Sequence, residues 1–341
     1  MRAARFVRAG VPLEIDSLPR PVLSPGESLI LVKAVGICGS DVHILEGHTP
    51  TAYAPITLGH EISGVVEETD DESGRIAVGD HVFANPMVGC GECRFCLNGE
   101  INFCARREII GIQREGALAD YVVVPTANLT VMPDSIDFPE IALIESAGTA
   151  NHAVRVLGVS AGDTIAVIGT GGLGMQALRL ALARGAHVIA IDTDPAARQR
   201  CTDAGAHAAF DPSDPDLVES IRTATDRPDG VDGVVDCVGI QATFSTALQL
   251  LRLNGHCAVV GIGGKPLELT PPAHFMRRAL RVSGIYGYTN TDIAEVAERL
   301  TDGSLDLQAS VSAVFPLEEV NEGIRMFADR TNSPIRIVIT P

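Results

Sequence analysis

Long apolar segments are missing from this sequence of 341 residues. No apolar run approaches the roughly 18 residues that a transmembrane helix needs, and Met1 to Ala9 is basic without the apolar core of a signal peptide. We therefore expect a cytoplasmic protein with no membrane partner. Internal repeats and low-complexity stretches are also absent, so neither a solenoid nor a disordered chain is expected.

Basic residues are scarce as well. Lysine occurs only at Lys33 and Lys265, and 26 Lys and Arg stand against 43 Asp and Glu, which gives a formal net charge of −17. Nucleic acids and anionic membranes select basic surfaces, so we expect neither as a partner. With 46% hydrophobic and 20% charged residues, the composition is that of a soluble globular protein, and the length suffices for two domains.

Cysteine is present in an uneven distribution. Four of the eight cysteines fall in one short stretch, at Cys90, Cys93, Cys96 and Cys104. Disulfides are not expected in a large cytosolic protein, whereas four thiolates at this spacing close a tetrahedral structural zinc site with no open position. An iron–sulfur cluster is less favoured because the last interval differs from its motif. Unliganded core cysteines are the remaining alternative. We predict a structural zinc lobe at about residues 86–106.

Two patterns of hydrophobicity divide the chain. From Arg2 to about Val131, short alternating apolar segments are broken by Gly and Pro, which predicts a mostly antiparallel β domain. From 162 to about 287, six apolar strands alternate with amphipathic helices, which predicts a doubly wound parallel sheet. A final strand at 335–339 is expected to return to the first domain. The fold class is α/β, with domains at 1–148 plus 288–341 and at 149–287.

The second domain opens with a strand, a glycine turn and a helix. Gly169, Gly171 and Gly174 form Gly-x-Gly-x-x-Gly, and Asp192 ends the following strand. The first glycine permits the turn, the second lets the backbone approach a pyrophosphate, and the third lets the helix lie close to the strand. An acidic residue at the position of Asp192 takes ribose hydroxyls of NAD. This context predicts a dinucleotide site rather than a glycine turn without a ligand.

The acidic residues near that turn favour one cofactor. Asp192 and Asp194 put negative charge where the 2′-phosphate of NADP would lie, so NAD is favoured over NADP. Arg198 is the residue that could reverse this preference, because one helical turn brings a guanidinium within reach of a phosphate.

Three further metal-ligand residues lie far apart in the sequence. Cys38 follows a strand, His60 precedes one, and Glu145 lies just before the dinucleotide domain. Three such ligands plus an open position define a catalytic zinc. Each residue alone also fits an ordinary structural role, as a buried cysteine, a hydrogen-bonded core histidine or a helix-surface charge. Spacing alone leaves both interpretations open.

Several motifs together resemble the medium-chain, zinc-dependent alcohol dehydrogenase family, in particular its polyol and threonine dehydrogenase branch. They are Cys-Gly-Ser-Asp-x-His at 38–43, Gly-His-Glu at 59–61, the four-cysteine lobe, Gly-x-Gly-Gly-x-Gly at 169–174 and the final strand. The resemblance implies a chaperonin-10-like β-barrel catalytic domain and a Rossmann domain, with the active site in the cleft between them. It also implies a homodimer or homotetramer.

The resemblance further implies two zinc ions per chain. Cys38, His60 and Glu145 would bind the catalytic ion, where classical relatives have cysteine in place of the glutamate. Glu61 would be a neighbour that exchanges with substrate or water. Ser40 and His43 would relay the proton that alcohol oxidation releases.

The same carry-over implies a set of cofactor contacts. Thr149 would brace the nicotinamide ring, with Leu173 packed beside it, and Arg336 would reach the pyrophosphate. The complete set of implied dinucleotide contacts is Gly169, Gly171, Gly172, Leu173, Gly174, Asp192 and Arg336.

The interpretation that follows is a zinc-dependent, NAD-linked dehydrogenase. It would interconvert a small-molecule alcohol, secondary or a polyol or amino alcohol, with a ketone or aldehyde. A zinc-independent enone or quinone reductase on the same scaffold is the first alternative, and a non-catalytic zinc-lobe binding module is the second. The stretch after Glu145, from 146 to 152, lacks the proline common in polyol enzymes, which weakens any choice of substrate.

Overall fold

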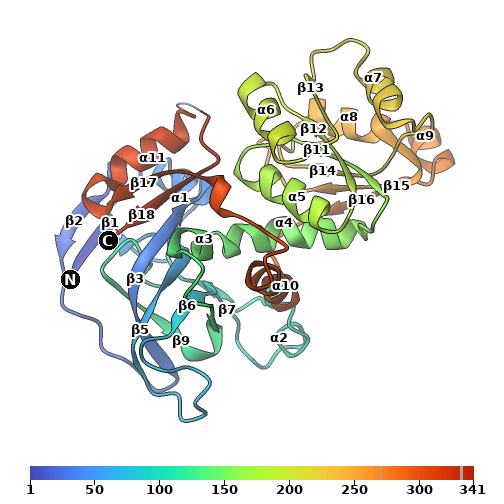
Figure 1. The fold of residues 1–341 in the computed structure, drawn as a ribbon. Coiled ribbons are helices and arrows are strands. Elements are labelled where there is room, and N and C mark those ends of the chain that lie inside the picture. Colours follow the sequence, from blue (N-terminus) through green and yellow to red (C-terminus); the bar gives the residue numbers. More distant parts are fainter. Residues whose placement is uncertain (270, 331–332) are drawn as a thin grey trace. The chain divides into compact units, whose positions relative to one another are not determined.

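The computed structural model describes residues 1–269, 271–330 and 333–341. The chain forms two compact units, one of Met1–Ser146 with Thr289–Pro341 and one of Ala147–Tyr288 (Figure 1). The domain boundaries expected from the sequence, 148 and 287, lie one or two residues from these. Within the described ranges, no helix is long and apolar enough to cross a membrane.

The first unit is built mainly from short strands. Its strands are β1 (Arg2–Phe6), β2 (Glu14–Ser17), β3 (Glu27–Ile37), β4 (Ile56–Thr57), β5 (Glu61–Thr69), β6 (His81–Ala84), β7 (Met87–Val88), β8 (Glu108–Ile109), β9 (Tyr121–Pro125), β10 (Leu129–Val131), β17 (Val311–Pro316) and β18 (Arg336–Thr340). Its helices are α1 (Gly39–Leu45), α2 (Arg94–Leu97), α3 (Phe138–Ala142), α10 (Asn290–Thr301) and α11 (Val320–Ala328), with 3-10 turns at Ile101–Phe103, Thr126–Asn128, Gln308–Ser310 and Leu317–Glu319. Helix α4 (Ile144–Leu157) begins here and continues into the second unit.

Strand β3 is the centre of the first unit. The main sheet has the order β10-β6-β5-β3-β18-β17, and β9 also pairs with β3. Every named strand pair of this unit is antiparallel except β17 with β18, so the expected antiparallel β domain is confirmed. Leu29, Ile30 and Ile37 of β3 are fully buried, because the neighbouring strands and the core residues of this unit cover them.

The register of β3 determines which residues meet at its carboxyl end. Gly36 lies opposite Glu61 of β5, and Ile37 lies opposite Ile337 of β18. A Cβ atom on Gly36 would stand 2.1 Å from Oε2 of Glu61, so only glycine leaves room for that carboxylate. The last strand of the chain therefore returns to the first domain, as expected, and ends beside its third strand.

The second unit is a parallel sheet with helices. Its strands are β11 (Thr164–Ile168), β12 (His187–Ile191), β13 (Ala208–Phe210), β14 (Val231–Asp236), β15 (Leu251–Val259) and β16 (Arg281–Gly284). Besides α4, its helices are α5 (Gly172–Ala183), α6 (Pro195–Asp203), α7 (Leu217–Thr225), α8 (Gln241–Leu250) and α9 (Pro272–Arg277). The strand order β13-β12-β11-β14-β15-β16 is the doubly wound arrangement that the sequence predicts (Figure 1).

Both faces of this parallel sheet are buried. Ile168 and Ile191 share a hydrophobic cluster with Phe244 of α8, while the alternate residues Val167 and Val188 are also fully buried. Successive residues of a strand point to opposite faces, so helices cover the sheet on both sides. This explains why the strands read as continuous apolar runs.

Local contacts set the ends of two elements. Strand β14 ends at Asp236, because the Asp236 carboxylate accepts hydrogen bonds from the backbone N–H groups of Val238 and Gly239 and closes a turn there. The helical segment before the second unit is two helices, α3 and α4, interrupted at Leu143. This break puts Glu145 in the first turn of α4.

Candidate metal and dinucleotide sites

One candidate metal site lies where β3 ends and β5 begins. Cys38 follows β3, and His60 and Glu61 stand at the start of β5. One ligand atom from each of these three residues lies within 4.8 Å of the others. His60 is 5% exposed and Glu61 is fully buried. A thiol, an imidazole and a carboxylate are the donor types that zinc prefers, so the set fits that ion.

Asp41 orients two members of this set. Its Oδ2 atom accepts a hydrogen bond of 3.0 Å from the backbone N–H of Cys38, and its Oδ1 atom lies 3.4 Å from Nδ1 of His60. Burial alone lowers the pKa of His60, but the charge of Asp41 and the sulfur of Cys38 outweigh it and hold that pKa well above its usual value. A carboxylate that accepts a hydrogen bond from Nδ1–H leaves Nε2 to face a metal.

Sequence reasoning missed this role of Asp41. The residue lies inside the Cys-Gly-Ser-Asp-x-His motif, three positions after Cys38, at the spacing of a helix-capping box. That spacing is the signal that could have identified it.

Glu61 forms a buried ion pair with Arg336. Their Oε1 and Nη1 atoms are 3.1 Å apart, and both side chains are almost completely buried. Burial raises the pKa of Glu61, and the Arg336 guanidinium opposes this rise. The other carboxylate oxygen, Oε2, has no hydrogen-bond partner among the described residues. A buried carboxylate oxygen without a hydrogen-bond partner is expected beside a cation.

The roles expected for Glu145 and Arg336 stay predictions. Glu145 is 9% exposed and close enough to raise the pKa of Arg336, but it is not in the group of ligand atoms around Cys38. Arg336 contacts Glu61, and its expected contact with a pyrophosphate stays a prediction. The structure therefore brings Cys38, His60, Glu61 and Arg336 together, with Glu145 nearby.

The predicted relay residues lie on α1. Ser40 Oγ is 3.0 Å from Nε2 of His60, so its hydroxyl group lies directly beside the candidate metal site. His43 is half-buried on the same helix, and its ring centroid is 6.1 Å from that of the exposed His48. The helix thus carries one group next to the site and one with access to solvent.

The four-cysteine lobe is a second candidate metal site. Cys90 follows β7, Cys93 precedes α2, Cys96 lies on that helix, and Cys104 follows a 3-10 turn. All four sulfurs lie within 4.8 Å of one another, and those of Cys90 and Cys96 are 3.9 Å apart. Zn–S bonds of about 2.3 Å in a tetrahedron put the sulfurs ~3.8 Å apart, so the group fits zinc.

The lobe is also electrostatically suited to a cation. The backbone N–H groups of Glu92 and Cys93 lower the pKa of Cys90 to about 6, while burial and the neighbouring sulfurs raise the pKa of Cys96 to about 12. Four thiols this close together cannot all be ionised unless a positive ion lies between them. A Cβ on Gly89 would lie 2.7 Å from the Cys96 sulfur, so glycine is needed there.

The glycine turn of the second unit has the geometry that dinucleotide binding needs. Gly169 has φ +80°, and a Cβ on Gly174 would stand 1.9 Å from the Gly169 carbonyl oxygen. A Cβ on Gly171 would meet nothing within 4 Å, so this position faces open space at the start of α5. The first two residues of α5, Gly172 and Leu173, offer helix N-terminal backbone to an anion.

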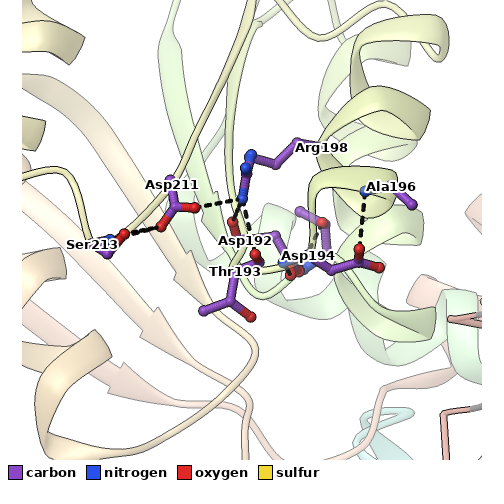
Figure 2. Close-up of polar contacts among 8 residues, drawn as sticks. Asp192, Thr193, Asp194, Ala196, Arg198, Asp211 and Ser213 are labelled. Carbon is purple, nitrogen blue, oxygen red and sulfur yellow. Dashed lines mark hydrogen bonds and ion pairs between the residues drawn. The ribbon is translucent and has the colours of Figure 1, made fainter.

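Asp192 lies against this turn. Its Oδ2 atom accepts hydrogen bonds of 2.7 Å from the N–H and 3.0 Å from the hydroxyl of Thr170, between the glycines. Its Oδ1 atom accepts one of 2.9 Å from the N–H of Asp194 (Figure 2). The carboxylate is thereby fixed beside the glycine turn, at the carboxyl end of β12. Thr149 lies on α4 in the same unit.

Both units match known family models. The alcohol dehydrogenase GroES-like domain matches residues 24–134, and the zinc-binding dehydrogenase model matches residues 172–302. The fold and the sites define a two-unit, nicotinamide-dependent oxidoreductase with candidate metal sites in its GroES-like unit.

Similar proteins cover almost the whole chain. L-galactonate-5-dehydrogenase of Escherichia coli is 30% identical over 96% of this chain and 96% of its own. An NAD-dependent alcohol dehydrogenase of Sulfurisphaera tokodaii is 32% identical over 95% of each chain. A Sinorhizobium meliloti protein described as a zinc-binding dehydrogenase, bound to NADP, has a TM-score of 0.91 at 30% identity and covers 100% of this chain and 99% of its own. The chain belongs to the medium-chain, zinc-dependent alcohol dehydrogenase family.

Membership of this family tests several predictions made from the sequence. The resemblance to the family, the chaperonin-10-like plus Rossmann fold class and the interpretation as a zinc-dependent dehydrogenase are confirmed. A non-catalytic zinc-lobe module is disfavoured, since the match extends over the dinucleotide unit as well.

The four-cysteine lobe gives a direct test of its metal. Cys96→Ser is expected to release about one zinc per chain and lower the melting temperature, because the site loses a ligand that the lobe folds around. Zinc content by mass spectrometry and thermal unfolding measure the two effects. Cys237→Ala, in the second unit, is the control and should keep the full zinc content. Equal zinc in both variants would show that the lobe holds none.

Proposed function

We propose that this protein oxidises an alcohol to a ketone or aldehyde, reversibly and with NAD, using one catalytic and one structural zinc per chain. The observation that carries the proposal is the convergence of Cys38, His60 and Glu61 within 4.8 Å, in a chain of this family. A buried, polar group of this kind in a largely apolar β domain is suited to activate a single oxygen atom.

Residues of the first unit would each have a separate role in the reaction. Cys38 and His60 would hold the ion, and Asp41, whose Oδ1 atom lies 3.4 Å from Nδ1 of His60, would keep His60 in the tautomer that does so. A zinc ion bound there would lower the pKa of an alcohol and stabilise the charge that develops on its oxygen. Ser40 would accept the released proton and give up its own through the nicotinamide ribose to His43, which would pass a proton to solvent. The position of both residues on α1 supports these roles.

The third ligand is a carboxylate. We assign it to Glu145, with Glu61 as the neighbour that replaces substrate or water between turnovers. The proximity of Glu145 to Arg336, and of Arg336 to Glu61, supports an arrangement in which one guanidinium balances both acids. Arg336 is also the residue we expect to reach the cofactor's pyrophosphate.

The second unit would bind the cofactor through the glycine turn at 169–174, with Thr149 and Leu173 beside the nicotinamide. NAD is preferred over NADP, which the carboxylates of Asp192 and Asp194 at the carboxyl end of β12 support. Relatives include one named as NAD-dependent and one bound to NADP. The proposal includes a homodimer or homotetramer, a cytoplasmic location, and a secondary alcohol, polyol or amino alcohol as substrate.

A panel of diols, polyols, amino alcohols and cyclic alcohols tests the activity. With NAD, at least one class is expected to produce NADH, detected by its absorbance, and a chelator that removes both zinc ions should abolish turnover until zinc is restored. Turnover that survives metal removal would favour the zinc-independent reductase. If no alcohol reduces either NAD or NADP, the proposed function is wrong.

The carboxylate ligand is tested by two matched variants. Glu145→Gln is expected to lower the zinc content from two to one per chain, because an amide oxygen binds zinc more weakly than a carboxylate. Glu61→Gln makes the same change 4.8 Å or less from the Cys38 and His60 ligand atoms and is expected to retain both ions. The reverse result would assign the ligand to Glu61.

The proton relay is tested at His43. His43→Gln is expected to lower kcat by about tenfold or more and to change its pH profile, since the amide cannot carry a proton. His48→Gln, which changes the neighbouring exposed ring, is the control and should leave kcat and the profile as they are. An unaltered profile in His43→Gln would remove that residue from the mechanism.

A further inference from the structure

A second acidic residue stands beside Asp192 at the carboxyl edge of the parallel sheet. Ile191 of β12 is in register with Phe210 of β13, and the Asp192 N–H donates to the Phe210 carbonyl at 3.1 Å. The residue that follows Phe210 is Asp211, so the two carboxylates occupy equivalent positions on adjacent strands. Asp211 is outside every motif that the sequence presents.

Asp211 forms an ion pair with the arginine that bears on cofactor choice. Arg198 projects from α6, and its Nη1 atom lies 3.0 Å from Oδ2 of Asp211. The same nitrogen donates to the backbone carbonyls of Asp192 at 2.7 Å and Thr193 at 3.0 Å. Figure 2 shows the guanidinium between the ends of the two strands, with these contacts drawn as dashed lines. The Arg198 side chain is 21% exposed, so it is held against the protein.

The carboxylate of Asp211 is itself held in place. Its Oδ1 atom accepts hydrogen bonds from the N–H of Ser213 at 2.9 Å and from the Ser213 hydroxyl at 2.6 Å. These bonds leave Oδ2 directed at Arg198 (Figure 2). The Ser213 bonds and the Arg198 charge lower the pKa of Asp211, which keeps the carboxylate ionised at neutral pH.

The chemistry of the two cofactors differs at one group. NADP carries a 2′-phosphate where NAD has a hydroxyl, and an arginine near the end of the second strand is the side chain that accommodates this phosphate. A guanidinium binds phosphate through two parallel hydrogen bonds, provided that its N–H groups are free to turn toward it. Arg198 is in the right segment, but Asp211 and two carbonyls already engage its Nη1 atom.

We propose that Asp211 is a specificity-determining residue for the dinucleotide: its carboxylate pairs with Arg198 and prevents that arginine from binding a 2′-phosphate. NAD is then preferred for two separate reasons, the acid at Asp192 and the engaged arginine. This inference rests on the proposed dinucleotide site at the glycine turn. It predicts that removing the charge of Asp211, without changing the glycine turn or Asp192, moves the preference toward NADP.

The test compares matched variants of the full-length, zinc-loaded protein. Asp211→Asn removes the charge but keeps an oxygen for the Ser213 bonds. Asp214→Asn is the control, because it removes the same charge from the same loop at a carboxylate that accepts from Asp216 N–H and the Ser220 hydroxyl. Dissociation constants for NADH and NADPH are measured by nicotinamide fluorescence, at one ionic strength, for both variants and for wild type.

Asp211→Asn is expected to raise the affinity for NADPH relative to NADH by about tenfold, the size of one charge-assisted contact. The control should change this ratio by less than about twofold, as a screened surface charge does. Adding Arg198→Gln to Asp211→Asn should cancel the gain. In the wild-type background, Arg198→Gln should leave NADPH affinity unchanged, which keeps the inference testable if Asp211→Asn does not fold.

Several results would overturn the inference. They are an unchanged ratio in Asp211→Asn, a gain that persists after Arg198→Gln, and a tenfold loss of NADPH affinity in Arg198→Gln alone. A persistent gain would point instead to Arg200, which lies 3.9 Å from the Asp194 carboxylate. If the wild type binds NADH and the variants give one of these results, the inference is wrong but the proposed function stands. Wild type that binds neither dinucleotide overturns both.

Discussion

The antiparallel register of β3 is the constraint on which the first unit depends. It sets Gly36 against Glu61 and Ile37 against Ile337, and so brings Cys38 to the beginnings of two strands that are far away in sequence. Because side chains alternate along a strand, a slip of one residue would turn Glu61 away from Cys38 and into another layer. The absence of a side chain at Gly36 then provides the space for the carboxylate. The pairing of the strands therefore determines which side chains meet at the candidate metal site.

The charges buried where β3, β5 and β18 meet explain which residues lie there. Glu61 and Arg336 are both removed from water, and such a pair is costly unless its remaining polar atoms are satisfied. A cation among Cys38, His60 and Glu61 would supply the missing partner for Glu61 Oε2. The four-cysteine lobe follows the same principle, since its four sulfurs lie within 4.8 Å of one another and one divalent ion would compensate their charges. In both places the protein gathers donor groups suited to a metal ion.

The second unit uses strand ends in another way. Parallel strands bring their carboxyl ends to one edge of the sheet, so the glycine turn after β11, Asp192 after β12 and Asp211 after β13 are neighbours. The topology therefore determines which loops surround a dinucleotide. The contacts within that edge determine whether Arg198 is free, and with it the charge presented to the 2′ position of the ribose.

The sequence by itself determined what is local. The glycine turn with its strand and helix, the four-cysteine lobe and the change from antiparallel to parallel strands all depend on spacing within short segments, which a pattern records. Only the tertiary structure decided that Glu61 joins Cys38 and His60 with Glu145 nearby, that Arg336 pairs with Glu61, and that Asp211 holds Arg198. These contacts join residues on different strands through register and side-chain rotamers, and hydrophobic periodicity carries no information about either.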